Sequence, residues 1–304
     1  MRVTAWRVAM AVVVLVAAAF VTQRLDLWHT ESAKRAEDVA EKAIDAEEAP
    51  FTAHVSRFRE DTSMVQAGRY VLDRPLTAAE RQKAASFAID TTEMDTFLRS
   101  IGARRLGDPS KIPHNVDTPP YADASSFNLQ LHSSRKSTLT ITDLRAKVLR
   151  CNPSRARAVF ERHPEGEAAY TGVLYDLTKE GSAAVTTQAT GRETEELGQP
   201  FFRNNVINLG GGEEPANLRV ESLTSGRSCA WELLATYSDE TGTHTRAIRD
   251  SGKPFFTEAA PVSPDQYWVA AMTDTEDGEW ADCATGKPSS DVVKYTCEGS
   301  RRQN

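Results

Sequence analysis

The short motifs of the best-known catalytic sites are absent from this 304-residue sequence. It has no G-x-S-x-G nucleophile elbow, no S-x-x-K beside its partner motifs and no H-E-x-x-H zinc helix. A phosphate-binding loop is also missing, because Gly210-Gly211-Gly212 is followed by two glutamates, whose charge would repel phosphate. We therefore expect this glycine run to form a turn, and the sequence predicts no catalytic residue.

Metal ligands are sparse as well. The chain has six histidines and four cysteines, and it lacks any C-x-x-C pair, so zinc is not expected. His163, Glu165 and Glu167 lie in RHPEGE, whose proline and glycine predict an exposed turn. The densest acid cluster consists of Asp274, Glu276, Asp277, Glu279 and Asp282. No EF-hand register fits this cluster around Gly278, which leaves a solvated loop or a calcium loop of another kind. The sequence predicts no metal and no cofactor.

Basic residues are outnumbered. The chain has 36 Lys and Arg against 43 Asp and Glu, for a net charge of −7. Nucleic acids and anionic lipid surfaces bind basic faces, so neither is an expected partner of the bulk of the chain. The same composition is typical of a soluble acidic surface.

Long apolar runs are missing everywhere except at the start, where Val8–Val21 reads VAMAVVVLVAAAFV. With Arg7 and Arg24 snorkelling, residues 8–27 can span a bilayer as a signal-anchor. The basic residues before the run put residues 1–7 in the cytoplasm and the bulk outside. A cleaved signal peptide ending at Ala17-Ala18-Ala19 is the alternative. No cysteine follows the run closely, which excludes a lipoprotein anchor.

The four cysteines fit an oxidising compartment. Cys283 and Cys297 enclose a short polar loop with glycine and proline, which makes them natural partners. Cys151 then pairs with Cys229 by elimination. Four unpaired thiols are the alternative.

The segments after the anchor differ in pattern. Residues 28–50 are rich in Ala, Glu and Lys and predict a helical stalk. Residues 51–106 predict a small helical or α/β region, since Thr77–Glu80 and Asp90–Glu93 resemble capping boxes before helices. Gly102 is the expected stop of the second helix. Residues 107–126 are rich in Pro, Asp and Ser and predict a linker.

Alternation with a period of two begins after the linker and predicts an antiparallel β-sandwich over 127–257, immunoglobulin-like in broad architecture. The frame shifts near Thr142 or Asp143, which fits a bulge, and again before Leu223. A hairpin is expected around Ser238–Gly242, and Phe255 and Phe256 can cover a sheet edge. The specific immunoglobulin signature is absent, because Trp231 is too close to Cys229.

The tail, 258–304, is expected to hold two more strands, Tyr267–Met272 and Asp291–Cys297, around an acidic loop that the Cys283–Cys297 bond would close. No internal repeat or low-complexity run is present.

The sequence resembles a set of uncharacterised membrane-anchored proteins of actinomycetes. The likeness rests on the N-terminal anchor, on LTITDLRAKVLRC (Leu139–Cys151) and on WELLATYSDETGTHTRAI with KPFFTEA (Trp231–Ala259). It implies an extracytoplasmic β-rich domain and carries over no site residue.

Two classes of function remain. The first is a non-enzymatic envelope protein that binds a partner protein or a cell-wall component. The second is an exported hydrolase. A pair of carboxylates that cleaves glycosides is defined by its separation in three dimensions, so the sequence does not exclude one. We favour the first, because sandwich scaffolds often serve recognition and every motif search is negative.

Overall fold

The computed structural model describes residues 49–56, 68–89, 92–106, 122–162, 172–188, 198–271 and 278–284, with positions 34, 291, 294, 296 and 297. Within these ranges the chain is mainly β, its strands are mostly antiparallel and its helices are few and short, which confirms the expected fold class at that level. None of the helices in these ranges has the length and apolar content needed to cross a membrane. The expected anchor, 8–27, and most of the expected stalk lie outside the described residues.

Sheet A has five strands in the order β1-β4-β10-β7-β8. Their bounds are β1 Thr52–Ser56, β4 Ala122–His132, β10 Ala216–Ser225, β7 Gly172–Asp176 and β8 Val185–Gln188. All neighbours are antiparallel except β10 and β7, which run parallel.

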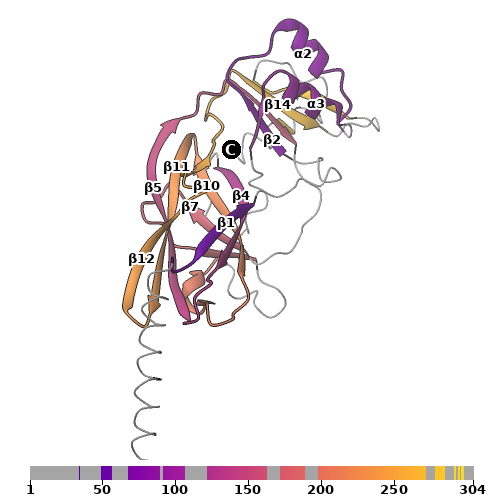
Figure 1. Ribbon diagram of the computed structural model, residues 1–304. Helices are drawn as coiled ribbons and strands as arrows, with labels where there is room; N and C mark the ends of the chain where they lie inside the picture. The colour runs from indigo at the N-terminus through magenta and orange to yellow at the C-terminus, as the bar shows by residue number, and fades with distance from the viewer. Residues whose placement is uncertain are drawn as a thin grey trace, which may run out of the picture.

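Sheet C is built on two long antiparallel strands, and its order is β12-β11-β5-β9, with β13 also paired to β11. The bounds are β5 Leu139–Pro153, β9 Ile207–Leu209, β11 Arg227–Asp239, β12 Gly242–Ile248 and β13 Phe255–Thr257. A single 3₁₀ turn, η4 (Phe201–Arg203), precedes β9. Sheets A and C make the elongated lower body in Figure 1, which we call the two-sheet body.

One hydrophobic core joins sheets A and C. Phe127, Leu129 and Leu131 enter it from β4, and Trp231 and Leu233 enter it from β11. In a strand, alternate side chains point to opposite faces, so the period-two pattern read from the sequence places these residues on one side. At about 25 cal/mol per Å² of apolar surface removed from water, burial of such side chains is the main stabilising term of this body.

The bulge expected near Thr142 is present. Asp143 lies opposite Thr236 and Ile141 lies opposite Tyr237, so Thr142 is the extra residue on β5. A second irregularity leaves Leu149 without a partner, because Arg150 pairs with Ala230 and Val148 pairs with Trp231. The frame shift expected before Leu223 is absent: β10 pairs with β4 without interruption, and Leu223 is buried on the other face.

The two expected turns are confirmed. Gly210, Gly211 and Gly212 all have positive φ after β9, and a side chain at Gly210 would collide with the carbonyl oxygen of Ser137. The hairpin between β11 and β12 is tighter than expected, because Asp239 pairs with Gly242 and only two residues connect the strands.

Sheet B is a separate five-stranded sheet in the order β15-β14-β6-β2-β3. Its strands are β2 Gly68–Leu72, β3 Arg104–Leu106, β6 Ala158–Arg162, β14 Gln266–Ala271 and β15 Glu279–Asp282. Only β14 and β6 run parallel. Helices α2 (Ala78–Ala84) and α3 (Glu93–Ser100) lie beside this sheet at the top of Figure 1. Their apolar residues share a core with Phe160 and Trp268.

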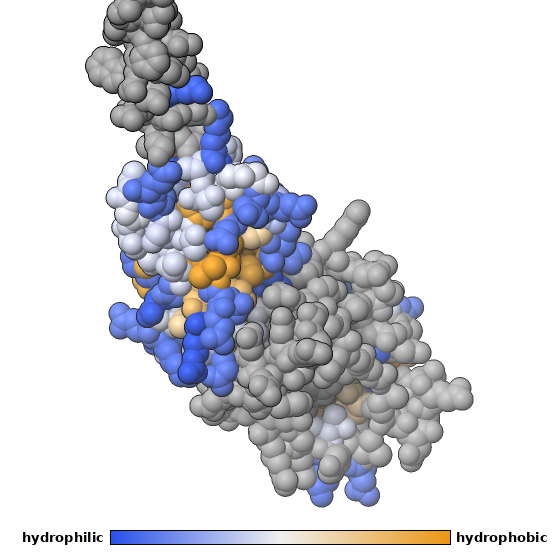
Figure 2. All heavy atoms as spheres, turned by 90° about the horizontal axis from the view of Figure 1, so that it is seen from below, coloured by the Kyte–Doolittle hydropathy of each residue, from blue (hydrophilic) through white to orange (hydrophobic). Residues whose placement is uncertain are grey.

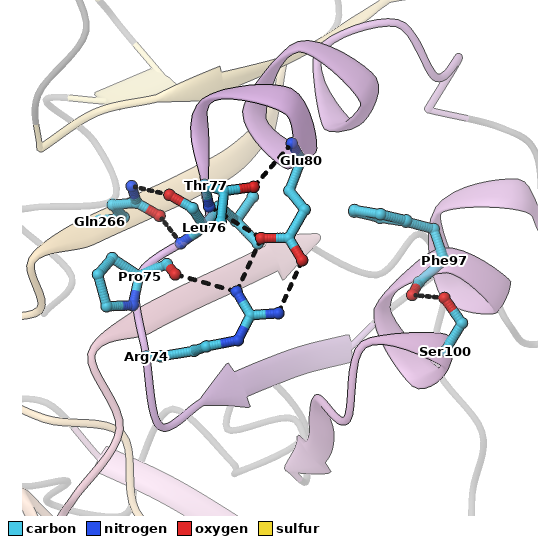
Figure 3. Close-up of polar contacts among 8 residues, drawn as sticks. All are labelled: Arg74, Pro75, Leu76, Thr77, Glu80, Phe97, Ser100 and Gln266. Carbon is cyan, nitrogen blue, oxygen red and sulfur yellow. Dashed lines mark hydrogen bonds and ion pairs between the residues drawn. The ribbon is translucent and has the colours of Figure 1, made fainter.

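Helix α2 begins with the expected capping box. Thr77 accepts a hydrogen bond from the Glu80 backbone, and the Glu80 carboxylate accepts one from the Thr77 backbone. Arg74 adds a bidentate ion pair to Glu80, and Gln266 of β14 bonds both backbone groups of Leu76 (Figure 3). The Arg74 guanidinium lowers the pKa of Glu80 to about 2. These contacts attach α2 to sheet B.

Helix α3 ends where the sequence predicts, but its N-terminus lacks the expected capping box. Its N-cap is Thr92, whose side chain makes no capping bond. Gly102 follows the helix with φ of 86°, as expected for a helix stop.

Strand pairing crosses the boundaries expected from the sequence. β1, from the 51–106 region, joins sheet A, whereas β6, from within 127–257, joins sheet B between β2 and β14. β4 begins at Ala122, inside the expected linker. The described positions between Asp291 and Cys297 are helical, so the strand expected there is wrong. Local periodicity carries no information on pairing between segments this far apart in sequence.

Candidate functional site

The outer face of sheet C is the candidate site. Ala146, Trp231, Ile248 and Phe255 of this sheet belong to the buried core. Their neighbours in each strand point the opposite way, toward solvent. The outward set is Lys147, Leu149, Arg150, Ala230, Glu232, Arg249 and Phe256. We call this set the outer face of sheet C.

Two large apolar side chains on this face are exposed. Phe256 is 60% exposed and Leu149 is 41% exposed. Phe256 lies directly opposite Ala230, and Ala230 lies opposite Arg150, next to the bulged Leu149. Because neighbouring strands are about 4.8 Å apart, the two apolar side chains flank Ala230 within a single row across the sheet.

Phe256 is held outward by the anchoring of its two neighbours. The Phe255 ring stacks on Phe127 with centroids 4.6 Å apart. The Thr257 hydroxyl accepts a hydrogen bond from the Trp231 indole at 2.9 Å and bonds the Ser222 hydroxyl at 2.6 Å. A three-residue strand with both ends buried has little freedom to turn its middle side chain inward, so the exposure of Phe256 is built into the fold.

The Cys151–Cys229 disulfide crosses the same strands one row away. Cys151 and Cys229 are direct partners of β5 and β11, and Cys229 also lies opposite Thr257. The bond therefore ties β5 to β11 beside the row that holds Phe256, Ala230 and Arg150.

Glu232 points outward but is only 3% exposed. Its carboxylate bonds Arg249 at 2.7 Å and Lys147 at 3.4 Å, and these side chains come from the strands on either side. Long basic side chains bury their stems over apolar surface and keep their charges in water. Lys147 and Arg249 therefore cover the glutamate while their own side chains stay 55% and 44% exposed.

A second polar cluster lies at the far end of β11. Asp239 bonds Arg135 at 3.1 Å, His244 at 3.2 Å and both the backbone and hydroxyl of Thr241. Burial acts to raise the pKa of Asp239, but the Thr241 hydrogen bonds and the His244 charge outweigh it and lower the pKa to about 2. The His244 ring nitrogen is occupied by Asp239 and Thr241, so the cluster closes the hairpin.

Apolar side chains are also visible at the lower end of the two-sheet body. Figure 2 shows them gathered in one area among polar ones. The other exposed large apolar residues in the described part of the chain are Val206 at 56% and Val262 at 48%. Phe256 and Leu149 lie on the two sides of Ala230 in one sheet. Val206 and Val262 do not form such a pair with another exposed large apolar residue of the described part of the chain.

Both expected disulfides are present. Cys151 bonds Cys229, and Cys283, which follows β15, bonds Cys297. The alternative of four unpaired thiols is therefore wrong.

The residues considered as metal ligands are only partly described. Residues 163, 165, 167, 274, 276 and 277 lie outside the described ranges. Glu279 and Asp282 are in β15, and Asp282 accepts backbone hydrogen bonds from Tyr267 and Ala284. The described residues contain no group of three or more His, Cys, Asp or Glu arranged to hold a metal ion.

No protein-family model matches the chain, and no curated protein matches it. The resemblance to membrane-anchored actinomycete proteins stays a prediction.

The sequence reading missed the outer face of sheet C, although one signal was present. Leu149 occupies a position where the alternation of Arg145, Ala146, Lys147 and Val148 requires a polar residue. An apolar residue on the polar side of a strand marks either a bulge or an exposed contact, and Leu149 is both. Phe255 and Phe256 were expected to cover a sheet edge, but both lie within strand β13, where Phe255 enters the core and Phe256 is exposed. The outward direction of Phe256 depends on the pairing of β13 with β11.

Proposed function

We propose that the protein is a non-enzymatic binding module of the cell envelope, held by a single N-terminal membrane helix with the bulk of the chain outside the cytoplasm. Sheets A and C form its mainly antiparallel β-sandwich, immunoglobulin-like in broad architecture. The outer face of sheet C binds a protein partner.

The extracytoplasmic placement is supported by the pairing of all four cysteines. Disulfides of this kind persist in oxidising compartments and are rare in the cytosol. The apolar run over 8–27 and the basic residues before it supply the anchor and its orientation.

One observation carries the binding role: Phe256 is exposed on a strand whose neighbouring residues hold it outward. Aromatic side chains, phenylalanine included, are enriched in protein interfaces relative to the rest of the surface. A side chain that is already held in place loses less conformational entropy on binding than a mobile one. Phe256 and Leu149 together provide such an anchor on a sheet braced by a disulfide.

Photo-crosslinking in the source cells tests the binding role. A benzophenone amino acid at position 256 or 149 is expected to yield the same discrete protein adduct, whereas the same group at the exposed position 262 yields none. The adduct at 149 should disappear in the Phe256→Ser background. Equal labelling from all three positions, or labelling from none, would contradict the proposal.

The placement is tested with reporter fusions after Gly102. A reporter that requires the periplasm or an oxidising exterior is expected to be active, and one that requires the cytoplasm is expected to be inactive. The reverse pattern would overturn the topology without bearing on the binding face.

A further inference from the structure

We propose that the partner segment on the outer face of sheet C is an extended acidic peptide with an apolar side chain two residues from an aspartate or glutamate. This inference rests on the binding role proposed above and adds the chemistry of the partner.

The charges of the face have the sign opposite to that of the chain. The face holds three basic residues, Lys147, Arg150 and Arg249, and one carboxylate, Glu232, whereas the whole chain carries −7. Glu232 already has both of its oxygens engaged by Lys147 and Arg249. Arg150 is exposed and has no carboxylate partner among the described residues. The face therefore keeps unneutralised positive charge, which is complementary to an anionic partner.

The apolar and basic groups lie in adjacent rows. Phe256, Ala230 and the bulged pair Leu149 and Arg150 form one row across the strands. Arg249, Glu232 and Lys147 form the next row on the same face. Residues two apart in a strand are separated by about 6.6 Å. Side chains at positions i and i+2 of an extended peptide have the same spacing and also point to one side. An apolar residue over Phe256 thus brings an acidic residue at i+2 over Arg249, and an apolar residue over Leu149 brings one over Lys147.

The small size of the apolar row favours a peptide over a membrane. Its apolar part consists of one phenyl ring, one leucine side chain and one alanine, and it is bounded by Arg150 in the same row and by the charged groups of the next row. That area matches one side chain of a partner. Nucleic acid would require a denser array of cations than three residues beside a carboxylate.

The test uses the full chain in detergent and a fluorescein-labelled peptide with the repeat Leu-Ser-Asp-Ser. Each leucine in this peptide is two residues from an aspartate. Binding is measured by fluorescence anisotropy at low salt. The wild-type chain is expected to bind this peptide and to bind it more weakly as salt rises, since exposed charge pairs are screened. Peptides with lysine in place of aspartate, or with serine in place of leucine, are expected to bind at least about fivefold more weakly, the equivalent of about 1 kcal/mol.

Matched variants locate the peptide. Arg150→Glu and Phe256→Ser are expected to weaken binding about fivefold or more, whereas Arg203→Glu, which makes the same charge change at an exposed position on η4, leaves it unchanged. Thermal melts of each variant check that the fold is intact. An equal loss from Arg203→Glu would mean that only net charge matters and would overturn the inference.

The outcomes separate this inference from the proposed function. A specific adduct at position 256 without acidic-peptide binding would leave the binding role standing and show that the partner has another chemistry. Binding instead to vesicles of phosphatidylglycerol and phosphatidylcholine, lost in Arg150→Glu, would make the face a membrane contact and overturn the peptide. Absence of both adduct and peptide binding would remove both proposals.

Discussion

At the scale of single residues, Thr257 has two roles that the local sequence does not reveal. It is fully buried, it accepts the Trp231 indole hydrogen bond, and it bonds Ser222 from the opposing sheet. A buried polar network of this kind is stabilising only while each member keeps its partners.

We predict that Thr257→Val lowers the free energy of unfolding by about 1–3 kcal/mol, because valine keeps the shape of the side chain and leaves buried polar groups without their partner. Denaturant unfolding measures the change. Thr245→Val, at an exposed position of β12, is the control and should change stability by less than about 0.5 kcal/mol. If both variants unfold at the same denaturant concentration, the network is not stabilising.

A second prediction at this scale concerns acid. The pKa of Asp239 is about 2 in the folded chain, below its usual value, so the folded state favours the ionised form. Its contribution is therefore fully present above about pH 4 and is lost as the pH falls toward 2. Asp239→Asn should be less stable than wild type at pH 7, and the difference should shrink between about pH 4 and pH 2. A difference that is constant over this range would contradict the assignment.

At the scale of elements, caps, turns and bulges were predictable from the sequence, whereas the pairing of strands was not. The capping box at Thr77, the stop at Gly102 and the bulge at Thr142 depend on residues within a turn or two of each other. β6 was missed, because both of its faces are buried and its sequence therefore shows no alternation. Its partners β2 and β14 also lie about a hundred residues away on either side.

Leu223 shows a second limit of local pattern. The change of frame there indicated a shift in pairing, but β10 is regular and simply buries both of its faces at that end. Alternation identifies a strand only where one face is solvated. The candidate site was hidden for a related reason, since the direction of Phe256 follows from the long-range pairing of β13.

The cap of α2 gives the prediction at this scale. Thr77→Ala removes the hydrogen bond to the Glu80 backbone and is expected to cost about 0.5–2 kcal/mol of stability. Thr77→Ser keeps the capping oxygen and should stay close to wild type. Chemical denaturation of the two variants provides the comparison, and equal losses would show that the hydroxyl is not the stabilising group.

At the scale of the whole molecule, the chain passes repeatedly between the two-sheet body and sheet B. β1, β4 and β5 alternate with β2, β3 and β6 along the sequence, and β14 returns to sheet B after β13. Arg104 of β3 adds a direct link, because it bonds both Asp73 and Glu258, and Glu258 immediately follows β13. Neither part is a continuous stretch of chain. One part therefore cannot unfold without pulling on the chain segments that connect it to the other.

We therefore predict that the two parts unfold in one cooperative transition. Trp231 reports on the core between sheets A and C, and Trp268 reports on the core under α2 and α3. Two variants are needed, each of which keeps only one of these tryptophans and carries phenylalanine at the other tryptophan positions. In each variant the fluorescence transition in denaturant should superimpose on the transition measured by circular dichroism. By the same reasoning a fragment of residues 120–260 should melt without cooperativity, because it lacks β1 and Phe51 from the shared core and leaves β6 without β2 and β14. Two separated tryptophan transitions, or a cooperative fragment, would show instead that the two-sheet body folds by itself and that sheet B assembles onto it afterwards.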